Sequence, residues 1–430
     1  MARMQANPTG RNRAFLLLAL FGLGLDCLAV PQAAKSGMAT EWVRKYNGPG
    51  NGDDAPKAIA VDSQGNVLVT GSSSKGEYHY GYLTIKYSPS GKRLWSRRYD
   101  GLSNGSSHAT AMVMDHQDNV LVTGYTEGAD TGLDYVTIKY NPDGKQLWLR
   151  RYNGPGNGQD FPNAIGVDAQ GNVYVTGHSW SGTSSDFLTI KYSPDGKRIW
   201  ARRYNGTENS AYMANAMAVD ANGNVYVIGS SYPSHGDDWM TTIKYNTDGR
   251  LLWVASHLGP TVDLDAARAI AVDAQGNVYV SGGNHGYFLT IKYSPEGQQL
   301  WERQDGKGKY GSPESIAVDP AGNVYVTGTS ATLKYSNDGQ LLWKLDSYAE
   351  ALALDPQSNV YITGFPGETF KYSSLGEEMW VGGYKEPGSN YYRTQAIALD
   401  KQGNVYVTGY SWPNAKYITI KYTQSPRTGP

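Results

Sequence analysis

The fold is decided by the stretch Ala164-Ile-Gly-Val-Asp168-Ala-Gln-Gly-Asn172-Val-Tyr-Val-Thr-Gly177, which has the pattern of an apolar strand, a tight polar turn and a second strand. Variants of it begin at Ala58, Ala111, Ala164, Ala216, Ala269, Ser315, Ala351 and Ala396. A second phrase follows each copy, as in Thr189-Ile-Lys-Tyr192, Ser193-Pro-Asp-Gly196 and Lys197-Arg-Ile-Trp200. Copies of one four-strand unit, mostly about fifty residues apart, predict an all-β fold, a β-propeller of four-stranded antiparallel blades. We count eight blades.

The two ends of the repeated region complete each other. The N-terminal phrase Glu41-Trp-Val-Arg-Lys-Tyr-Asn-Gly48 matches residues 147–154, which are the last strand of a unit. The eighth unit runs from Ala396 to Tyr422 and lacks that strand. We therefore expect the N-terminal strand to pair with the C-terminal blade and close the ring, which removes the exposed edge of an open array.

The innermost strand of each blade can be identified from side-chain size. The first strand of a unit carries small residues at alternate positions, as in Ala58/Ala60 and Ala164/Gly166. Because successive side chains of a strand point to opposite faces, one face of this strand is nearly bare, as the crowded axis of a propeller requires. We call the four strands of a unit a, b, c and d in chain order. The order from axis to rim is therefore predicted to be a, b, c, d.

The connections between strands differ in kind. The a–b and c–d connections are short and rich in Asp, Asn and Gly, as hairpin turns are. The b–c and d–a connections are longer and vary from copy to copy. In an antiparallel blade these two sets emerge at opposite ends, which we call the turn face and the loop face. Units 6 and 7 have short b–c loops, so the loop face is expected to be low there.

Residues 1–29 have the pattern of a secretory signal peptide. Basic residues at positions 3, 11 and 13 precede an apolar run, and Cys27-Leu-Ala29 places small residues at a cleavage site. The run is short for a membrane span, although an uncleaved anchor is the alternative. We expect a secreted, periplasmic or cell-surface protein with no transmembrane span in its mature chain, and no disulfide there because Cys27 is the only cysteine.

The rest of the domain organisation follows from these limits. We expect a linker at 30–40, one propeller domain at 41–423 and a C-terminal tail at 424–430. The formal net charge is −1, which gives no electrostatic basis for binding nucleic acid. A monomer is expected.

The repeated phrases resemble the SBBP-type β-propeller repeats of bacterial exported proteins, from Ala-Ile-Ala-Val-Asp-x-x-Gly-Asn-Val-Tyr-Val-Thr-Gly to Ile-Lys-Tyr. The likeness covers roughly residues 41–423. It implies an exported propeller and no established catalytic residues. That family's name refers to seven blades, so seven is the alternative to our count.

A weaker likeness concerns Tyr192-Ser-Pro-Asp-Gly-Lys-Arg-Ile-Trp200, which is similar to the Gly-Lys-x-x-Trp docking phrase of quinoprotein propellers. In those proteins the phrase packs neighbouring blades together. The chain has no vicinal cysteines, so we predict no quinone cofactor, and no cofactor of any other kind.

What recurs in every copy is interpreted as scaffold. The Asp of each a–b turn, as at Asp168, lacks the dense spacing of calcium ligands and is predicted to accept hydrogen bonds from turn amides. The Lys of each Ile-Lys-Tyr phrase lies at the same end of its blade, so an Asp–Lys pair is plausible. No metal site is predicted.

What differs between copies is a candidate for function. Trp180, Trp239 and Trp412 fall outside the repeated Trp strands, in the b–c loops, together with carboxylates and histidines. The ligand-binding candidates are Trp180, Trp239, Trp412, Tyr78, His79, Tyr80, His178, Asp186, His235, Asp237, Asp238 and His285.

Aromatic side chains with carboxylates are typical of sugar-binding surfaces, and protein interfaces favour the same aromatics. We therefore predict an exported binding module that presents its loop face to an extracellular glycan or protein partner. The alternative is a propeller enzyme: a polysaccharide hydrolase or lyase using paired carboxylates, or a quinone-dependent oxidoreductase. No catalytic residues can be assigned from the sequence.

Overall fold

A computed structural model describes residues 38–424, apart from 51, 77–78, 102–104, 207–210, 233–238, 259–265, 285–286, 306–310, 386, 390 and 413–415. Contacts divide the chain into two units, Met1–Lys35 and Ser36–Pro430. The described residues all belong to the second unit, and they form thirty-two strands and no helix. The predicted signal peptide lies outside them.

The strands are best named by their place in a blade. The a strands are β2 (Asp54–Val61), β6 (Ser107–Met114), β10 (Asp160–Val167), β14 (Ala211–Val219), β18 (Ala266–Val272), β22 (Pro313–Val318), β26 (Ala351–Leu354) and β30 (Tyr391–Leu399). The b strands are β3 (Val67–Ser74), β7 (Val120–Glu127), β11 (Val173–Trp180), β15 (Val225–Tyr232), β19 (Val278–Asn284), β23 (Val324–Gly328), β27 (Val360–Thr363) and β31 (Val405–Trp412).

The outer half of each blade follows the same order. The c strands are β4 (Tyr80–Tyr87), β8 (Leu133–Tyr140), β12 (Ser185–Tyr192), β16 (Trp239–Tyr245), β20 (Tyr287–Tyr293), β24 (Thr332–Tyr335), β28 (Glu368–Tyr372) and β32 (Tyr417–Gln424). The d strands are β5 (Arg93–Tyr99), β9 (Gln146–Tyr152), β13 (Arg198–Tyr204), β17 (Leu251–Leu258), β21 (Gln299–Asp305), β25 (Leu341–Leu345), β29 (Glu378–Gly383) and β1 (Met38–Tyr46).

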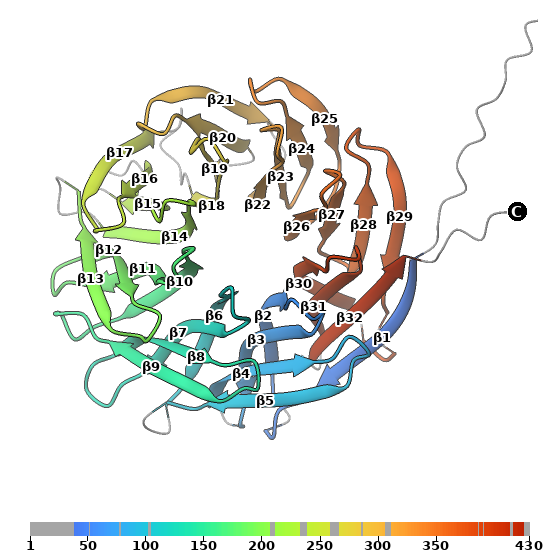
Figure 1. The fold of residues 1–430 in the computed structure, drawn as a ribbon, viewed down its shortest axis with the longest axis horizontal. Helices are drawn as coiled ribbons and strands as arrows, with labels where there is room; N and C mark the ends of the chain where they lie inside the picture. Colours follow the sequence, from blue (N-terminus) through green and yellow to red (C-terminus); the bar gives the residue numbers. More distant parts are fainter. Residues whose placement is uncertain are drawn as a thin grey trace, which may run out of the picture. The chain divides into compact units, whose positions relative to one another are not determined.

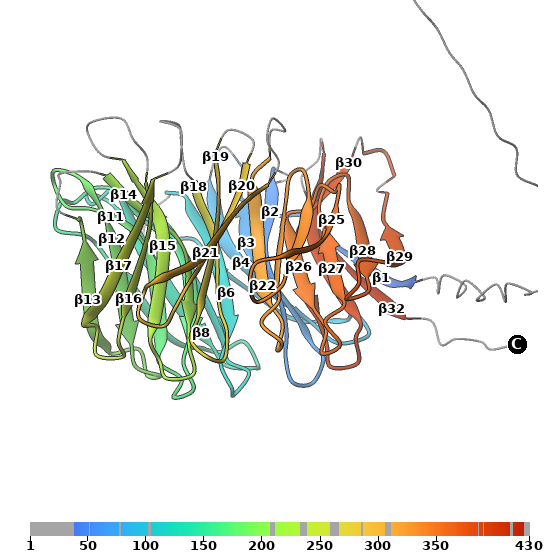
Figure 2. The same ribbon diagram turned by 90° about the horizontal axis from the view of Figure 1, so that it is seen from above.

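The described strands form eight four-stranded antiparallel sheets, which are the blades of a propeller (Figure 1). Blade 1 is β2–β5, each later blade takes the next four strands, and blade 8 is β30, β31, β32 and β1. The a strands of successive blades contact one another around the axis, and the d strands lie at the rim. The predicted fold class, strand order and blade count are confirmed. Figure 2 shows the short a–b and c–d turns together on one side of the ring.

The ring is closed as predicted by the N-terminal strand. β1 pairs antiparallel with β32, with Trp42 opposite Lys421 and Val43 opposite Ile420. Trp42 is only 6% exposed, and its Nε1 donates to the carbonyl oxygen of Pro89 in blade 1 at 2.9 Å. The first and last segments of the propeller are therefore held in one sheet.

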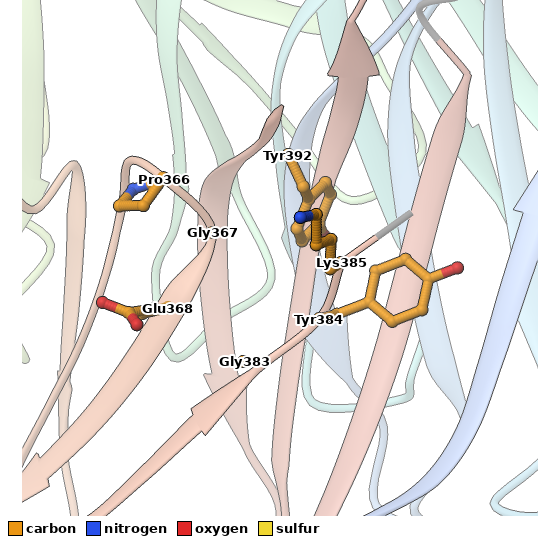
Figure 3. Close-up of a pocket in the computed structure, with 7 residues that line it drawn as sticks. All are labelled: Pro366, Gly367, Glu368, Gly383, Tyr384, Lys385 and Tyr392. Atoms are coloured by element: carbon orange, nitrogen blue, oxygen red, sulfur yellow. The ribbon is translucent and has the colours of Figure 1, made fainter. Parts of the chain in front are cut away.

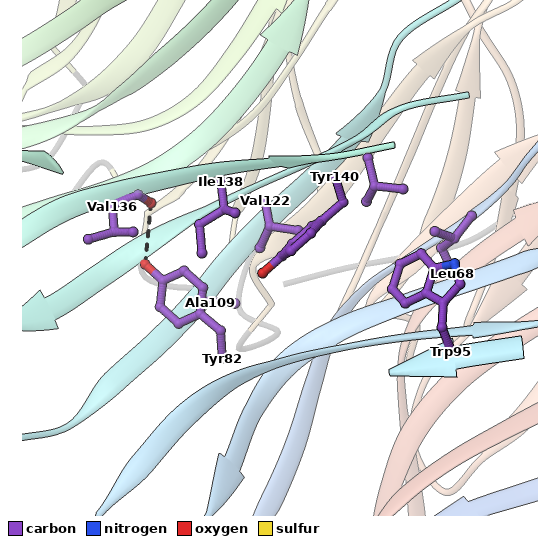
Figure 4. Packing of buried hydrophobic residues seen from close by; sticks show 9 residues of the cluster. Leu68, Tyr82, Trp95, Ala109, Val122, Val136, Ile138 and Tyr140 are labelled. Atoms are coloured by element: carbon purple, nitrogen blue, oxygen red, sulfur yellow. Dashed lines mark hydrogen bonds between the residues drawn. The ribbon is translucent and has the colours of Figure 1, made fainter. Parts of the chain in front are cut away.

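The hydrophobic core lies between blades rather than in one central mass. One cluster joins Leu68, Tyr82 and Trp95 of blade 1 to Val122 and Tyr140 of blade 2 (Figure 4). The Tyr82 hydroxyl crosses this interface and donates to the carbonyl oxygen of Val136 at 3.3 Å. Similar clusters join the following blades, so each blade is stabilised mainly by its two neighbours.

A repeated contact on the turn face locks neighbouring blades together. Trp95 Nε1 and Lys86 Nζ of blade 1 both donate to the carbonyl oxygen of Pro142 in the c–d turn of blade 2, at 2.9 and 3.0 Å. The glycine of that turn, Gly144, has φ near +79° and lies on the Trp95 ring, where a Cβ would come within 2.7 Å of a ring carbon. Glycine is required there for both reasons. The docking role implied by the quinoprotein-like phrase is confirmed.

The Asp of each a–b turn is structural, as predicted. Asp62 Oδ1 accepts from the amides of Gln64 and Asn66, and Lys86 Nζ lies 2.8 Å from Asp62 Oδ2. Burial raises the pKa of Asp62, but the hydrogen bonds from Lys86 and Asn66 outweigh it and hold the pKa below its ordinary value. The Asp–Lys pair is direct here because the neighbouring b-strand residue is Leu68.

Most other blades have tyrosine at the position of Leu68. Tyr174 donates its hydroxyl to Asp168 Oδ2 at 2.9 Å, and the Lys191 ammonium lies over the Tyr174 ring at 5.0 Å. Lys191 Nζ is 3.9 Å from Asp168 Oδ2. The tyrosine thus replaces the lysine as hydrogen-bond donor to the aspartate. The Lys191 ammonium is satisfied by the cation–π contact and by the Thr247 carbonyl oxygen at 3.0 Å.

Candidate functional site

The b and c strands of the larger blades run further towards the loop face than the repeated phrases predict. Trp180 is the last residue of β11, where it pairs with Ser185, and Trp239 is the first residue of β16, where it pairs with Ser231. The two tryptophans are half-buried strand residues rather than exposed loop residues. The strand pairing extends past the repeated phrase, because each tryptophan still lies opposite a residue of the neighbouring strand.

Trp180 also packs against its own blade's neighbouring loop. A Cβ built on Gly156 or Gly158 of the d–a loop would come within 2.5 Å of the indole. Part of this ring therefore stabilises the loop. Trp412 ends β31, and its side chain is outside the described residues, as are Tyr78, His235, Asp237, Asp238 and His285. Their binding roles stay predictions.

Asp186 is the one carboxylate among the ligand-binding candidates that lies within the described residues, and it is already paired. Asp186 is 3% exposed, and its Oδ2 accepts from Arg203 Nη1 at 2.8 Å. Arg203 also donates to the carbonyl oxygen of Ser179 at the end of β11. Arg151 makes the matching contact with buried Asp134 in blade 2. These arginines connect the b–c loops to the d strands, so Asp186 has a structural role.

A row of rings in mutual contact crosses the loop-face ends of strands in blades 1–3. Its members, which we call the aromatic row, are Tyr80, His108, Tyr125, Phe161 and His178. Successive ring centroids are 4.9, 5.1, 4.9 and 5.0 Å apart. Every ring in the row is half-buried, so each shows part of its surface to solvent. His79 precedes the row in the chain and is exposed.

The row is assembled from two ladder pairs and the contacts between blades. His108 lies opposite Tyr125 in blade 2, and Phe161 lies opposite His178 in blade 3. Tyr125 and Phe161 then meet edge to face across the blade boundary, an arrangement that aromatic quadrupoles favour.

The two imidazoles are held in the neutral form. Burial lowers the pKa of His178 to about 4, and its Nδ1 is buried without a hydrogen-bond partner among the described residues. Burial also lowers the pKa of His108, and the nearby charge of Lys57 adds to this effect. His108 Nδ1 is 3.0 Å from the hydroxyl of Ser72. At neutral pH the row is therefore uncharged.

The scaffold does not require rings at these positions. The same ladder pair is Ala55 and Ser72 in blade 1 and Ala266 and Gly283 in blade 5. Sequence reasoning included Tyr80 and His178 but missed His108, Tyr125 and Phe161. The signal was present, because the residue after the b-strand glycine changes between copies while the glycine itself does not.

A charged cluster occupies the loop-face ends of the inner strands on the other side of the ring. Its members are Arg268, Glu314, Glu350 and Arg393. Arg393 Nε donates to Glu350 Oε1. Burial raises the pKa of Glu314, an effect that Arg268 opposes and the charge of Glu350 reinforces. Two carboxyl groups with different environments thus share this part of the face.

A cavity of about 360 Å³ lies between blades 7 and 8 on the loop face (Figure 3). It is lined by Pro366, Gly367, Glu368, Gly383, Tyr384, Lys385 and Tyr392. Tyr384 and Tyr392 meet edge to face at 5.8 Å. The short b–c loop of blade 7 leaves this space open, in line with the low side predicted over units 6 and 7.

Within the described residues, no group of three or more His, Cys, Asp or Glu side chains is placed to hold a metal ion. The same part of the chain contains no helix that is long and apolar enough to cross a membrane.

The sequence repeats match a known family model. The model, described as a β-propeller repeat and named SBBP, matches residues 41–78, 148–182, 306–332 and 382–414. These four regions, which make up less than half of the chain, are similar to SBBP β-propeller repeats. The resemblance inferred from the repeated phrases is thereby confirmed, and the SBBP matches include most of β1, the first two strands of blade 1, and β30 and β31 of blade 8.

One curated relative is an uncharacterised WD repeat-containing protein of Acanthamoeba polyphaga mimivirus. It is 26% identical over 190 residues, which make up 40% of this chain and 11% of the relative. The match therefore spans only a small part of that protein's length.

Solved propellers share the fold of this chain. The C-terminal WD40 domain of Sif2 has a TM-score of 0.62 at 10% identity, covering 91% of this chain and 99% of that domain. The Dos1 propeller has 0.58 at 9% identity, covering 89% and 96%. Sqt1 from Chaetomium thermophilum has 0.58 at 11% identity, covering 91% and 100%. At these identities the likeness concerns the fold alone.

Proposed function

We propose that this chain is an exported binding module that holds an extracellular protein or glycan on its loop face. The observation that carries the proposal is the aromatic row, a set of five half-exposed rings that the repeat itself does not require. Rigid aromatic rings supply contact area at low conformational cost, which is why they are common at binding surfaces. The signal-like N-terminal segment supports export to a secreted, periplasmic or surface location.

The side chains beside the row favour a protein partner over a glycan. A sugar needs several free hydrogen-bonding groups beside the stacking ring. The nearby carboxylates Asp134 and Asp186 are buried and already paired with Arg151 and Arg203. A neutral aromatic patch with few free polar groups fits the apolar centre of a protein interface.

A binding screen tests this proposal. The chain without residues 1–29 is applied to a glycan array and to an extracellular protein library, each with and without calcium. The hit is then titrated against the double variant Tyr125→Ala/Phe161→Ala, which we expect to weaken binding at least thirtyfold, since each central ring contributes about 1–2 kcal/mol.

The chain offers a matched control for that variant. Tyr348 and Phe365 form an exposed aromatic pair on the loop face of blade 7, 5.9 Å apart. The variant Tyr348→Ala/Phe365→Ala is expected to bind normally. Equal losses in both variants, with folding verified by circular dichroism, would remove the aromatic row from the proposal.

The charged cluster favours a second candidate, a polysaccharide hydrolase or lyase. Glu314, whose pKa is raised by burial, would act as the acid, and Glu350 as the second carboxylate. The test is release of reducing ends from a panel of polysaccharides. Activity that disappears in Glu314→Gln supports this candidate, and inactivity of the unaltered chain on the whole panel counts against it.

A further inference from the structure

The turn-face contact between blades has one exception. In seven interfaces between described blades, a tryptophan Nε1 and a lysine Nζ share one carbonyl oxygen of the next c–d turn. The tryptophan donors and their acceptors are Trp42–Pro89, Trp95–Pro142, Trp148–Pro194, Trp200–Thr247, Trp253–Pro295, Trp301–Asn337 and Trp343–Ser374, at 2.9–3.1 Å. The eighth tryptophan of this set, Trp380 in blade 7, is different.

Trp380 is different because of the way the ring closes. Blade 8 is made from the two ends of the chain, so no c–d turn joins β32 to β1. Where blade 1 turns back after Tyr87, blade 8 instead continues its ladder, with Ala39 opposite Thr423 and Met38 opposite Gln424. Closure by the N-terminal strand therefore removes the acceptor that Trp380 would have used.

The result is an unused donor, Trp380 Nε1, whose ladder partner Lys371 lines an open space. Trp380 is 3% exposed, and among the described residues its Nε1 has no hydrogen-bond partner. Lys371 lies opposite Trp380 in the blade 7 ladder, and its Nζ is 3.6 Å from Asp355 Oδ2. Lys371 also lines a cavity of about 440 Å³ between the turns of blades 7 and 8, with Asp355, Gln357, Asp400 and Gln402. We call this space the turn slot.

We propose that the turn slot binds a β-turn of another polypeptide, which supplies the carbonyl oxygen missing from blade 8. The other seven interfaces define what fits. The occupant needs a carbonyl oxygen aimed at both donors and, two residues later, a glycine with positive φ that lies flat on the indole. A buried donor without a partner is destabilising, so an occupant that accepts from Trp380 gains a contact that the free chain cannot make.

The size and chemistry of the slot agree with this class of ligand. A volume of about 440 Å³ accommodates a few residues of a turn. The slot lies on the turn face, opposite the aromatic row, so it is independent of the proposed function of the loop face. A chain with both surfaces could hold two partners at once.

The test uses a cyclic peptide with the sequence of residues 192–198, Tyr-Ser-Pro-Asp-Gly-Lys-Arg, which forms the docking turn of blade 3. Indole N–H signals of the full chain labelled with ¹⁵N are followed during titration, and Trp380→Phe assigns the signal of Trp380. We expect that signal to move downfield while those of the seven bonded indoles stay fixed.

Affinity variants then separate the slot from other sites. Measured by fluorescence anisotropy of the labelled peptide, Trp380→Phe and Lys371→Met should each weaken binding about fivefold, the value of one net hydrogen bond. Trp343→Phe is the matched control, because its indole is already bonded to Ser374, and it should bind normally. A peptide with valine in place of the glycine should not bind.

Three results would overturn the proposal. The first is an unmoved Trp380 signal at millimolar peptide. The second is equal affinity in Trp380→Phe and the unaltered chain. The third is a Trp380 signal that is already downfield in the free chain and moves upfield when residues 425–430 are deleted, since the slot would then belong to the chain's own C-terminal segment.

Discussion

Replacing tryptophan by phenylalanine should be tolerated better at Trp380 than at Trp343. Trp343 and Trp380 occupy the same position of their d strands. Neither is followed two residues later by an arginine that could stack on it, because Leu345 and Gly382 stand there. The substitution shortens both rings by the same amount. The variants therefore differ mainly in the fate of one N–H group.

The expected difference in the free energy of unfolding follows from the hydrogen bonds of the two indoles. Trp343→Phe loses a bond of 3.1 Å to the Ser374 carbonyl oxygen, which keeps its second donor, Lys334 Nζ, at 2.7 Å. The net loss is about 1 kcal/mol. Trp380→Phe removes a buried donor that has no acceptor, which relieves about 1 kcal/mol or more. The free energies of unfolding should differ by about 2 kcal/mol in favour of Trp380→Phe.

Urea unfolding of the isolated chain, followed by far-ultraviolet circular dichroism, measures this difference. The two midpoints are compared with that of the unaltered chain under identical conditions, and equal slopes show that the same surface unfolds. If the two variants unfold at the same urea concentration, or if Trp380→Phe is the less stable, the assignment of Trp380 as an unused donor is refuted.

Three further predictions test other parts of the structure. Deleting residues 38–46 should unfold or aggregate the whole ring, because it exposes β32 and the surface covered by Trp42; a monomer with unchanged melting temperature would contradict closure by β1. Burial holds the pKa of folded His178 at about 4, below its unfolded value of about 6.5. The free energy of unfolding should therefore fall by up to about 3 kcal/mol as pH drops from 6.5 to 4. In urea titrations at pH 7 and 4.5, His178→Phe should remove this part of the loss. Lys139→Met should cost about 3 kcal/mol by leaving buried Asp115 without its cation, whereas Lys244→Met should cost clearly less, because a tyrosine hydroxyl donates to the equivalent aspartate; similar unfolding midpoints for both variants would count against the tyrosine's role.

Much of the fold could be predicted because the same sequence pattern recurs in successive units. Bare Ala and Gly positions identified the a strands as innermost, and the orphan Trp42 strand identified the closure. Hairpin turns of fixed length separated the turn face from the loop face. These inferences rested on local patterns of the repeat, and the sheet order confirms the strand order and the closure.

The site was harder to predict because its contacts run between blades. The edge-to-face contact of Tyr125 with Phe161 joins residues of different units, and their distance depends on the angle between blades, which cannot be read from the sequence. The pairing of Asp186 with Arg203 likewise depends on how far the c strand extends before its loop. Residue type alone indicated which face to consider, but it did not indicate which side chains are already engaged.

The unused donor of Trp380 also lay beyond sequence reasoning. The missing c–d turn of blade 8 was visible in the sequence. Its consequence became clear only when the seven other tryptophans were found to share one acceptor geometry with a lysine.

The central claim, that the loop face binds through the aromatic row, is tested most directly by hydroxyl-radical footprinting with the partner from the binding screen. Oxidation of Tyr80, Tyr125 and Phe161 should fall when the partner is bound. Oxidation of Tyr348 and Phe365, which are 39% and 44% exposed on the same face, should stay unchanged. Protection of Tyr348 and Phe365 with no change in the aromatic row would contradict the account.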